Sequence, residues 1–242
     1  MTTQCLEEAK TKDAAATVAV TPAERIRRQR SAEIQYKIRH DAIKRIFDIA
    51  FSFIVLAVCL PIFLLIGILI KCTSKGPVFY SQERISRGGR PFRCYKLRSM
   101  HMDADKRLKK ILDTNPLLRL EWEDKHKLTN DPRVIPLGAF LRKTSLDELP
   151  QFWNVLIGDL SIVGPRPLVQ QEVSERLGPK AGKILSVRPG ITGIWQTSGR
   201  SDISYSKRIA LDEKYVDRRS FWLDIGLIAK TIPSMIFSKG AY

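Results

Sequence analysis

Two adjacent carboxylates, Asp147 and Glu148, stand in the apolar stretch "TSLDELPQFWN" (144–154) of a chain whose formal net charge is +16. An active site gives adjacent acids a chemical reason, because a carboxylate can hold a divalent metal such as Mg²⁺ together with a substrate phosphate. Helix capping is the alternative, since Ser145 and Glu148 form an S-x-x-E capping box. Capping accounts for one of the two acids better than for the pair.

Pro150 limits where a helix can begin near these acids. A helix that starts at Ser145 places Pro150 inside the hydrogen-bonded ladder, where its missing N–H removes a bond. A helix that starts at Asp147 places the proline in the first turn, where no N–H needs a partner. In both cases the acid pair lies at or near a helix N-terminus, which is the end that binds phosphate.

Cationic residues beside glycines, prolines or the acids complete the candidate site. The motif "GPRP" (164–167) holds Arg166 between two prolines, which stiffen the backbone around a guanidinium suited to bidentate phosphate binding. The motifs "RPG" (188–190) and "SGR" (198–200) place arginines beside glycines, where a ligand can approach the backbone. Each residue alone is a weak signal, but together they surround the acids with positive charge. The candidate phosphate-binding residues are Lys96, Arg98, Arg142, Arg166, Arg188 and Arg200.

The composition indicates an anionic partner. Lysines and arginines number 41 against 25 aspartates and glutamates in 242 residues, which favours nucleic acid, an anionic membrane surface or a phosphorylated substrate. The four cysteines and three histidines show no metal-ligand spacing, so reduced thiols in a cytoplasmic setting are expected. No motif in the sequence supports nucleic-acid binding.

A long uncharged run places the chain at a membrane. Residues 49–70, "IAFSFIVLAVCLPIFLLIGILI", are 22 residues without a charge. A straight helix of that length measures about 33 Å, against a hydrocarbon core of about 30 Å. The run begins too far from the N-terminus for a signal peptide, and no small-residue cleavage site follows it. We therefore expect a membrane protein, and the nucleic-acid hypothesis loses weight.

The flanks of this run and its central proline bear on topology. Basic residues both precede and follow the run, whereas the positive-inside rule assigns lysine and arginine to the cytoplasmic side. Pro61 removes one helical hydrogen bond and kinks or breaks the helix. A segment that enters the bilayer, bends at Pro61 and returns to the same face satisfies both observations. A kinked spanning helix is the alternative, because proline is tolerated there, and the residues alone favour neither.

These features divide the chain into four parts. Residues 1–22 have the composition of a disordered tail. Residues 23–45 are dense in arginine and lysine and predict a basic helix on anionic headgroups, with a solvated charged helix as the alternative. Residues 46–72 form the membrane helix broken at Pro61, and residues 73–242 form a domain on the cytoplasmic face that carries the candidate site.

Local patterns predict the elements of this last part. Alternating residues at 76–85 and 92–100 predict two strands joined by a glycine-containing turn. The stretch 149–159 predicts a helix closed by Gly158, and the amphipathic C-terminal stretch predicts helices whose Trp222 rests at the interface. The expected fold class is α+β and mostly helical, with a re-entrant membrane helix hairpin, a small cytoplasmic α/β domain and interfacial amphipathic helices.

Several stretches of the chain carry the resemblance to a known family. They are "KRIFDIAFSFI…LPIF" (44–63), "GPVFYSQERI" (76–85), "FRCYKLRSM" (92–100), "RKTSLDELPQFWNVLIGDLSIVGPRP" (142–167), "VRPGITGIWQTSGR" (187–200) and "LDEKYV" (211–216). Over roughly residues 43–242 the chain resembles the bacterial sugar transferases, that is, the monotopic polyprenyl-phosphate phosphoglycosyl transferases. The likeness is greatest to the undecaprenyl-phosphate galactose or glucose phosphotransferases of exopolysaccharide synthesis.

The resemblance implies a re-entrant helix at the inner membrane of a bacterium and a reaction at its cytoplasmic face. It implies that hexose-1-phosphate passes from a UDP-sugar to undecaprenyl phosphate, with Asp147 as nucleophile, Glu148 as a Mg²⁺ ligand and UMP as the other product. Downstream glycosyltransferases would use the lipid-linked product. A basic membrane-surface scaffold without catalysis is the competing hypothesis, and it predicts that both acids are dispensable. The sequence does not identify the sugar.

Overall fold

The computed structural model describes residues 22–125, 128, 131–198 and 203–236. The chain forms two compact units, residues 1–43 and 44–242. The described part of the smaller unit is the helical stretch 22–43. The predicted tail, apart from its last residue, lies outside the described residues, and so does Arg200.

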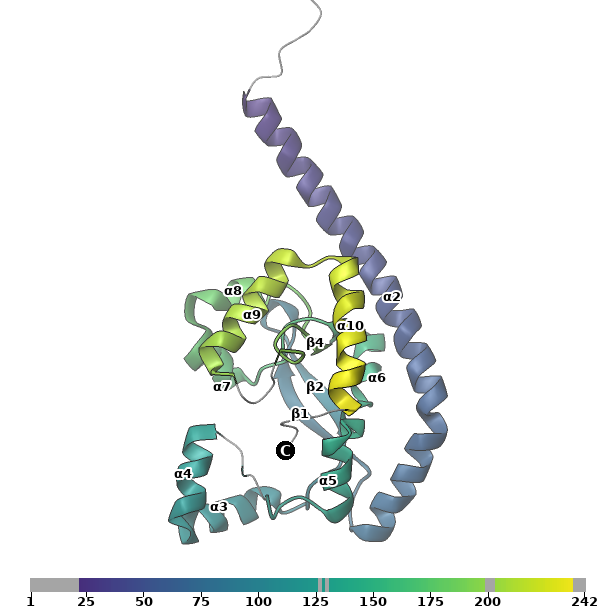
Figure 1. The fold of residues 1–242 in the computed structure, drawn as a ribbon, viewed down its shortest axis with the longest axis vertical. Coiled ribbons are helices and arrows are strands. Elements are labelled where there is room, and N and C mark those ends of the chain that lie inside the picture. Colours follow the sequence, from purple (N-terminus) through teal and green to yellow (C-terminus); the bar gives the residue numbers. More distant parts are fainter. Residues whose placement is uncertain (1–21, 126–127, 129–130, 199–202, 237–242) are drawn as a thin grey trace, which may run out of the picture. The chain divides into compact units, whose positions relative to one another are not determined.

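Helices dominate the described residues, and two small sheets accompany them (Figure 1). The α-helices are α2 (Pro22–Thr73), α3 (Ala104–Thr114), α4 (Pro116–Lys125), α5 (Pro136–Lys143), α6 (Gln151–Ile157), α7 (Gln170–Glu172), α8 (Ala181–Ile184), α9 (Tyr205–Arg218) and α10 (Phe221–Ile236). The strands are β1 (Phe79–Ile85), β2 (Pro91–Leu97), β3 (Ser161–Val163) and β4 (Gly190–Thr192). Shorter helical turns are η1 (Arg87–Gly89), η2 (Leu146–Glu148), η3 (Val173–Leu177) and η4 (Gly178–Lys180).

The predicted hairpin and the predicted helix after the acid pair are confirmed. Strands β1 and β2 pair antiparallel, with Tyr80 opposite Lys96. Helix α6 ends at Gly158, whose φ of 92° is the left-handed conformation that glycine adopts at low cost. The charged stretch after the hairpin forms two helices, because Pro116 starts α4 directly after Asn115, which caps the C-terminus of α3.

The apolar run lies in α2, which continues through Pro61 without interruption. The expected break is therefore not seen, and Figure 1 shows instead that this part of α2 bends. Proline bends a helix in this way because it removes a backbone hydrogen bond and crowds the preceding turn. Among the described residues, one stretch, Asp41–Thr73, is long and apolar enough to cross a membrane, and only 11% of its most apolar window is buried.

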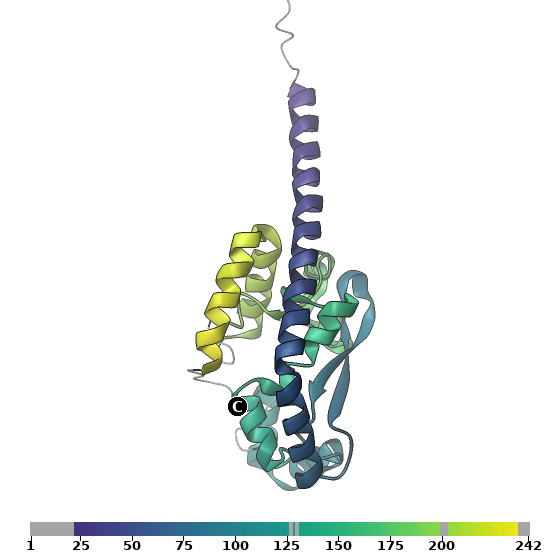
Figure 2. The same ribbon diagram turned by 90° about the vertical axis from the view of Figure 1, so that its right-hand side faces the viewer.

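Both ends of the apolar run pack on the same unit. At its start, Phe47 lies 5.5 Å from Phe221 of α10 between ring centroids. At its end, Ile66 and Ile70 are buried against Leu97 of β2 and against α5. Between these ends many side chains are exposed, including Phe53 (66%), Val58 (68%) and Leu64 (63%). Figure 2 shows α10 on one side of α2 and the β1–β2 hairpin on the other.

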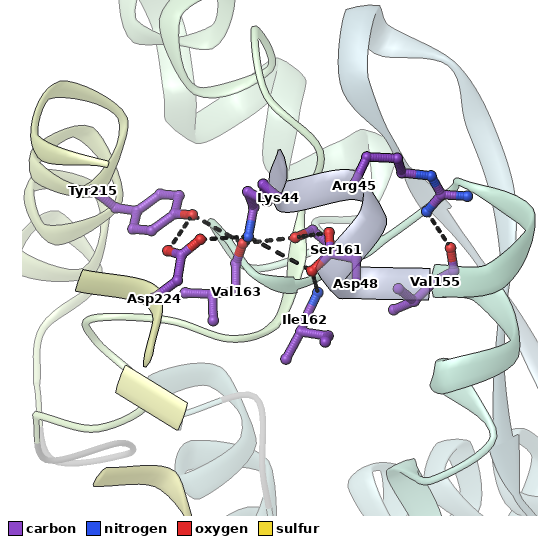
Figure 3. A network of polar contacts seen from close by, with 9 residues as sticks. All are labelled: Lys44, Arg45, Asp48, Val155, Ser161, Ile162, Val163, Tyr215 and Asp224. Carbon is purple, nitrogen blue, oxygen red and sulfur yellow. Dashed lines mark hydrogen bonds and ion pairs between the residues drawn. The ribbon is translucent and has the colours of Figure 1, made fainter. Parts of the chain in front are cut away.

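A buried polar network holds the start of the apolar run (Figure 3). Lys44 donates to Asp224 of α10 at 2.6 Å, and Asp224 also accepts from the Tyr215 hydroxyl. Asp48 accepts from the Ser161 hydroxyl at 2.7 Å and from a backbone N–H of β3. Each buried polar group thus finds a partner, as burial requires, and α2, α9, α10 and β3 are joined at one point.

The parallel pair β3–β4 brings two arginine motifs together. Gly164 donates its N–H to Thr192 at 2.9 Å, and Gly190 donates to Pro165 at 2.7 Å. A side chain at Gly164 would meet the carbonyl oxygen of Arg188 at 2.6 Å, so only glycine permits this approach. The backbones of the motifs "GPRP" and "RPG" are therefore in direct contact.

Candidate active site

The acid pair lies in the helical turn η2, directly before α6. Ser145 precedes it with φ 56° and ψ 18°, the left-handed region, and it is the one described non-glycine residue with positive φ. Its side chain caps nothing, so the capping-box interpretation is wrong for this turn. Asp147 is 7% exposed, and the carboxylate of Glu148 binds Lys96 instead of a backbone N–H.

Asn154 fixes the acid pair relative to strand β2. Its buried side chain accepts a hydrogen bond from the Tyr95 N–H at 3.0 Å and donates to the Arg93 carbonyl at 2.7 Å. The amide thereby fills the ladder positions on the open edge of the strand. With α6 held against β2, the Lys96 ammonium reaches Glu148 at 2.7 Å.

Burial and neighbouring charges shift the pKa values of Asp147 and Lys96. Burial raises the pKa of Asp147 to about 6, with Lys96 opposing the shift and Glu148 adding to it. Burial works against the charged form of Lys96, but the two carboxylates outweigh it, so its pKa lies above the ordinary value. Asp147 is consequently a carboxylate near the middle of its titration at slightly acidic pH, and Lys96 remains a cation.

Two predicted cations lie close to these groups. The charge of Arg142 lowers the pKa of Asp147, so its guanidinium is within electrostatic reach of that carboxylate. The charge of Arg166 works against the positive charge on Lys96 and on Arg84, which places its guanidinium within electrostatic reach of both. Arg166 is exposed, and its guanidinium lies 5.4 Å from the centre of the Trp195 ring.

Two other predicted cations donate hydrogen bonds to backbone carbonyls. The guanidinium of Arg98 is buried and donates to the Ser74 and Lys75 carbonyls directly after α2. Arg188 donates to the Gly158 carbonyl at 2.9 Å, at the end of α6 opposite the acid pair. Cations stabilise such exposed carbonyls at helix C-termini, so the described contacts of both arginines are structural.

Several residues around Arg166 were not predicted from the sequence. Arg84 of β1, partly buried, donates to the Pro167 carbonyl at 3.3 Å and lies 3.7 Å from Glu172. Arg208 of α9 stacks over Trp195 at 5.1 Å, beside Arg166. Both belong to stretches that carry the family resemblance or lie next to one, but a lone arginine in a strand or helix gave no distinct signal.

Asp212 was also missed, although the motif "LDEKYV" contains it. It is 5% exposed and lies close enough to Arg166 for the backbone N–H and the charge of that residue to act on its carboxylate. Burial raises its pKa to about 7, against the lowering effect of Arg166. Among the described residues, one of its carboxylate oxygens has no hydrogen-bond partner, as is true of the buried Trp195 Nε1 and Tyr205 hydroxyl. The loop of Arg166 is thus anchored beside buried polar atoms that have capacity for further bonds.

The donor set allows a limited metal site. No group of three or more histidine, cysteine, aspartate or glutamate side chains with metal-binding potential occurs among the described residues. Mg²⁺ commonly takes only one or two carboxylates from a protein and its other ligands from phosphate and water. Asp147, which binds no other described side chain by a hydrogen bond, and the adjacent Glu148 fit that requirement.

A comparison with known sequences identifies the family to which this chain belongs. The sequence profile described as "Bacterial sugar transferase" matches residues 39–238. The chain therefore belongs to the bacterial sugar transferase family, and the resemblance seen in its motifs is confirmed.

Three relatives illustrate the family. The undecaprenyl-phosphate galactose phosphotransferase of Salmonella typhimurium is 45% identical over 83% of this chain and 42% of its own length. The exopolysaccharide production protein ExoY of Rhizobium meliloti is 45% identical over 82% of this chain and 88% of its own length. The UDP-glucose:undecaprenyl-phosphate glucose-1-phosphate transferase of Klebsiella pneumoniae is 38% identical over 82% and 41%. The chain thus spans less than half the length of two of these relatives.

Proposed function

We propose that this chain transfers a hexose-1-phosphate from a UDP-sugar to undecaprenyl phosphate, giving the lipid diphosphate sugar and UMP. The observation that carries the proposal is a buried carboxylate, Asp147, that accepts no hydrogen bond from another described side chain and lies beside an acid–lysine pair and arginines. The names of the relatives, a galactose phosphotransferase and a glucose-1-phosphate transferase that act on undecaprenyl phosphate, support the substrate class. A place in exopolysaccharide assembly and delivery to downstream glycosyltransferases follow from the same proposal.

The proposed chemistry proceeds in two displacements at phosphorus. A carboxylate oxygen of Asp147 attacks the β-phosphorus of the UDP-sugar, and the bond from that phosphorus to the bridging oxygen breaks as UMP leaves. The lipid phosphate oxygen then attacks the aspartyl phosphate, which returns the carboxylate and forms the new diphosphate. The aspartyl phosphate is about as energy-rich as the diphosphates on either side, so neither displacement ends in a deep energy minimum.

The cations have separate roles in these steps. Lys96 holds Glu148 in place, while Arg142 and Arg166 offset the charge that grows on the phosphoryl oxygens. Mg²⁺, held by Glu148 and Asp147, would supply further charge neutralisation at the diphosphate. We expect no turnover in excess EDTA and recovery when Mg²⁺ is restored. Full activity in EDTA would rule out the metal.

The placement of α2 supports a monotopic topology at the cytoplasmic face of the inner membrane. Its apolar run is exposed in the middle, yet both ends pack on the unit that carries the acid pair. A straight spanning helix would separate its ends by about 30 Å of hydrocarbon, whereas a bent, re-entrant helix keeps both ends with one domain. Single cysteines near residues 40 and 76, introduced into a cysteine-free variant, should both be labelled from the cytoplasm. Labelling of either from the periplasm would establish a spanning helix.

The decisive experiment traps the covalent intermediate. Purified protein incubated with labelled UDP-sugar and no lipid acceptor should retain sugar phosphate on Asp147 and release one equivalent of UMP. The adduct should be labile to hydroxylamine, as acyl phosphates are, and kinetics with both substrates should be ping-pong. Asp147→Asn keeps the shape without the attacking charge, so it should form no adduct. Glu148→Gln should bind nucleotide and react slowly.

Two results would overturn the proposal. An adduct mapped to another residue, or a required ternary complex, would leave Asp147 as a metal ligand only. No transfer by the wild-type protein with any UDP-sugar, together with normal function of both acid variants in cells, would favour the non-catalytic membrane scaffold. A panel of UDP-sugars in the same assay identifies the sugar.

A further inference from the structure

A cavity of about 450 Å³ lies between α9, α10 and the turn at residues 194–198, away from the acid pair. Its lining is partly apolar and partly basic. Leu223, Leu227 and Ile194 supply apolar surface, and Thr197 and Ser198 line one side. Three cations from the two helices complete the lining, namely Lys214, Arg218 and Lys230.

The three cations are placed in a way that favours an anion between them. Lys214 and Arg218 are four residues apart on α9, where like charges repel. Lys230 joins them from α10, where it shares a face with the leucines at i−3 and i−7. Within the described part of the chain, none of the three forms an ion pair or hydrogen bond, whereas the neighbouring Lys183 pairs with Asp217. An anion in the cavity would relieve this repulsion.

The level of the cavity relative to the membrane indicates a lipid as the source of that anion. Phe221, two residues before Leu223, packs against Phe47 at the point where the apolar run of α2 begins. Trp222, next to it, is 80% exposed, and exposed tryptophans mark the headgroup level of a membrane. The cavity therefore opens near the level at which α2 meets the membrane, where phospholipid phosphates lie.

We propose that this cavity binds the headgroup of an anionic phospholipid, with phosphate on the three cations and the first acyl carbons on Leu223 and Leu227. The inference rests on the interfacial placement proposed above and not on the transfer reaction. None of the residues that line the cavity belongs to the acid-pair site. The bound lipid is therefore a structural anchor of α9 and α10, distinct from the reacting lipid.

The test is a lysine-labelling experiment on the full-length wild-type chain in non-ionic detergent. An amine-reactive reagent is applied with phosphatidylglycerol, with phosphatidylcholine, or with undecaprenyl phosphate, each at increasing mole fraction, and modification is read by peptide mass spectrometry. Phosphatidylglycerol should protect Lys214 and Lys230, and should leave exposed Lys207, on the same helix α9, reactive. Equal protection by phosphatidylcholine, or none by phosphatidylglycerol, would overturn the proposal.

The samples with undecaprenyl phosphate distinguish a phospholipid site from a site for the reacting lipid. Protection by undecaprenyl phosphate at a far lower mole fraction than phosphatidylglycerol would identify an acceptor site and overturn the anchor proposal. UMP release and adduct formation at Asp147, measured without phosphatidylglycerol, report on the proposed function independently.

Glutamine variants test whether the three cations of the cavity bind the lipid. Replacing Lys214, Arg218 and Lys230 by glutamine should weaken retention of phosphatidylglycerol about fivefold per cation in native mass spectrometry. The matched control replaces three exposed cations outside the cavity and should retain lipid normally. Its substitutions are Arg87→Gln, Arg93→Gln and Lys207→Gln. Equal loss in both triple variants would show that net charge alone attracts the lipid and would refute a site.

Discussion

Two clusters of the same composition, a lysine with two carboxylates, lie in different surroundings in this chain. Lys44 binds Asp224 at 2.6 Å and lies 3.8 Å from Asp48, and the exposure of these side chains is 13% for the lysine and 1–3% for the acids. Lys96 binds Glu148 at 2.7 Å, but there the side chains are 30% and 37% exposed. The first cluster is closed to solvent, and the second is open.

The clusters also differ in how completely their oxygens are bonded. Asp48 accepts from Ser161, and Asp224 accepts from Tyr215, in addition to their lysine contacts. Asp147, in the second cluster, accepts no hydrogen bond from another described side chain, and its pKa is raised to about 6. Fully bonded carboxylates stabilise a fold, whereas a buried carboxylate with capacity for another partner can bind or attack a substrate. The same three residue types thus serve structure in one place and reaction in the other.

Removal of a carboxylate from the closed cluster should have the largest effect on stability. Asp224→Ala leaves the partly buried Lys44 ammonium without its closest partner, and it leaves the Tyr215 hydroxyl with only the Val163 carbonyl of its two described acceptors. Loss of one member of a buried ion pair costs about 3–5 kcal/mol, and we expect that decrease in the free energy of unfolding of the detergent-solubilised protein. A decrease below about 1 kcal/mol would show that the network of Figure 3 contributes little.

Alanine variants in the two arginine motifs should likewise differ, one losing turnover and the other losing stability. Arg166 is exposed near the open cluster, so Arg166→Ala should slow turnover by about 1.5–3 kcal/mol, roughly 10- to 150-fold, with unchanged melting temperature. Arg188→Ala instead removes a bond to the Gly158 carbonyl and should lower stability by about 1 kcal/mol while the rate stays near normal. Near-normal turnover in Arg166→Ala, or a large rate loss in Arg188→Ala, would reverse these assignments.

The elements of the fold that depend on local signals were predictable from the sequence. The hairpin, the end of α6 at Gly158 and the apolar helix follow from residue alternation, a glycine cap and hydrophobic length. The effect of Pro61 was predicted less well, because proline can bend a helix as well as break it. The topology at the membrane remains a prediction.

The candidate site was predictable only in part. The acid pair and Lys96 come together as their neighbouring motifs indicated. Arg98 and Arg188 have the same sequence signal as Arg166, a cation in a characteristic motif, but tertiary packing directs them to carbonyl groups. Asp212 contacts the backbone of a residue 46 positions before it in the chain. Such long-range partners are set by the fold, and no local pattern reports them.

Asp147→Asn should make the protein more stable at neutral pH and catalytically inactive, unlike substitution of an acid in the closed cluster. The folded-state pKa of Asp147 is raised from 3.8 to about 6, so its favourable contribution is fully present below pH 3.8 and is lost as pH rises through 6. Above pH 6 the buried charge therefore costs stability, by about 1–3 kcal/mol, and asparagine removes that cost. Unfolding measured at pH 8 and pH 4 should show the gain only at pH 8. A loss at pH 8 would place Asp147 with the structural acids.

The same pKa sets the pH dependence of the first displacement. Attack requires the carboxylate, so adduct formation should fall as pH decreases through about 6. The charge of Glu148 raises the pKa of Asp147, so the slower Glu148→Gln variant should show this acid limb at lower pH. Rapid-quench measurements of UMP release between pH 4.5 and 8 test both statements. An acid limb that Glu148→Gln leaves in place would assign it to another group.

The smallest expected effect concerns the backbone before the acid pair. Ser145 adopts the left-handed region, which costs most residues about 1 kcal/mol but costs glycine little. Ser145→Gly should therefore raise the free energy of unfolding by up to about 1 kcal/mol with little change in adduct formation. Ser145→Ala, the matched control, should leave stability nearly unchanged, because the hydroxyl caps no described backbone N–H. A hydroxyl that caps the turn would make Ser145→Ala cost about 0.5–2 kcal/mol, and that result would restore the capping-box interpretation for one of the two acids.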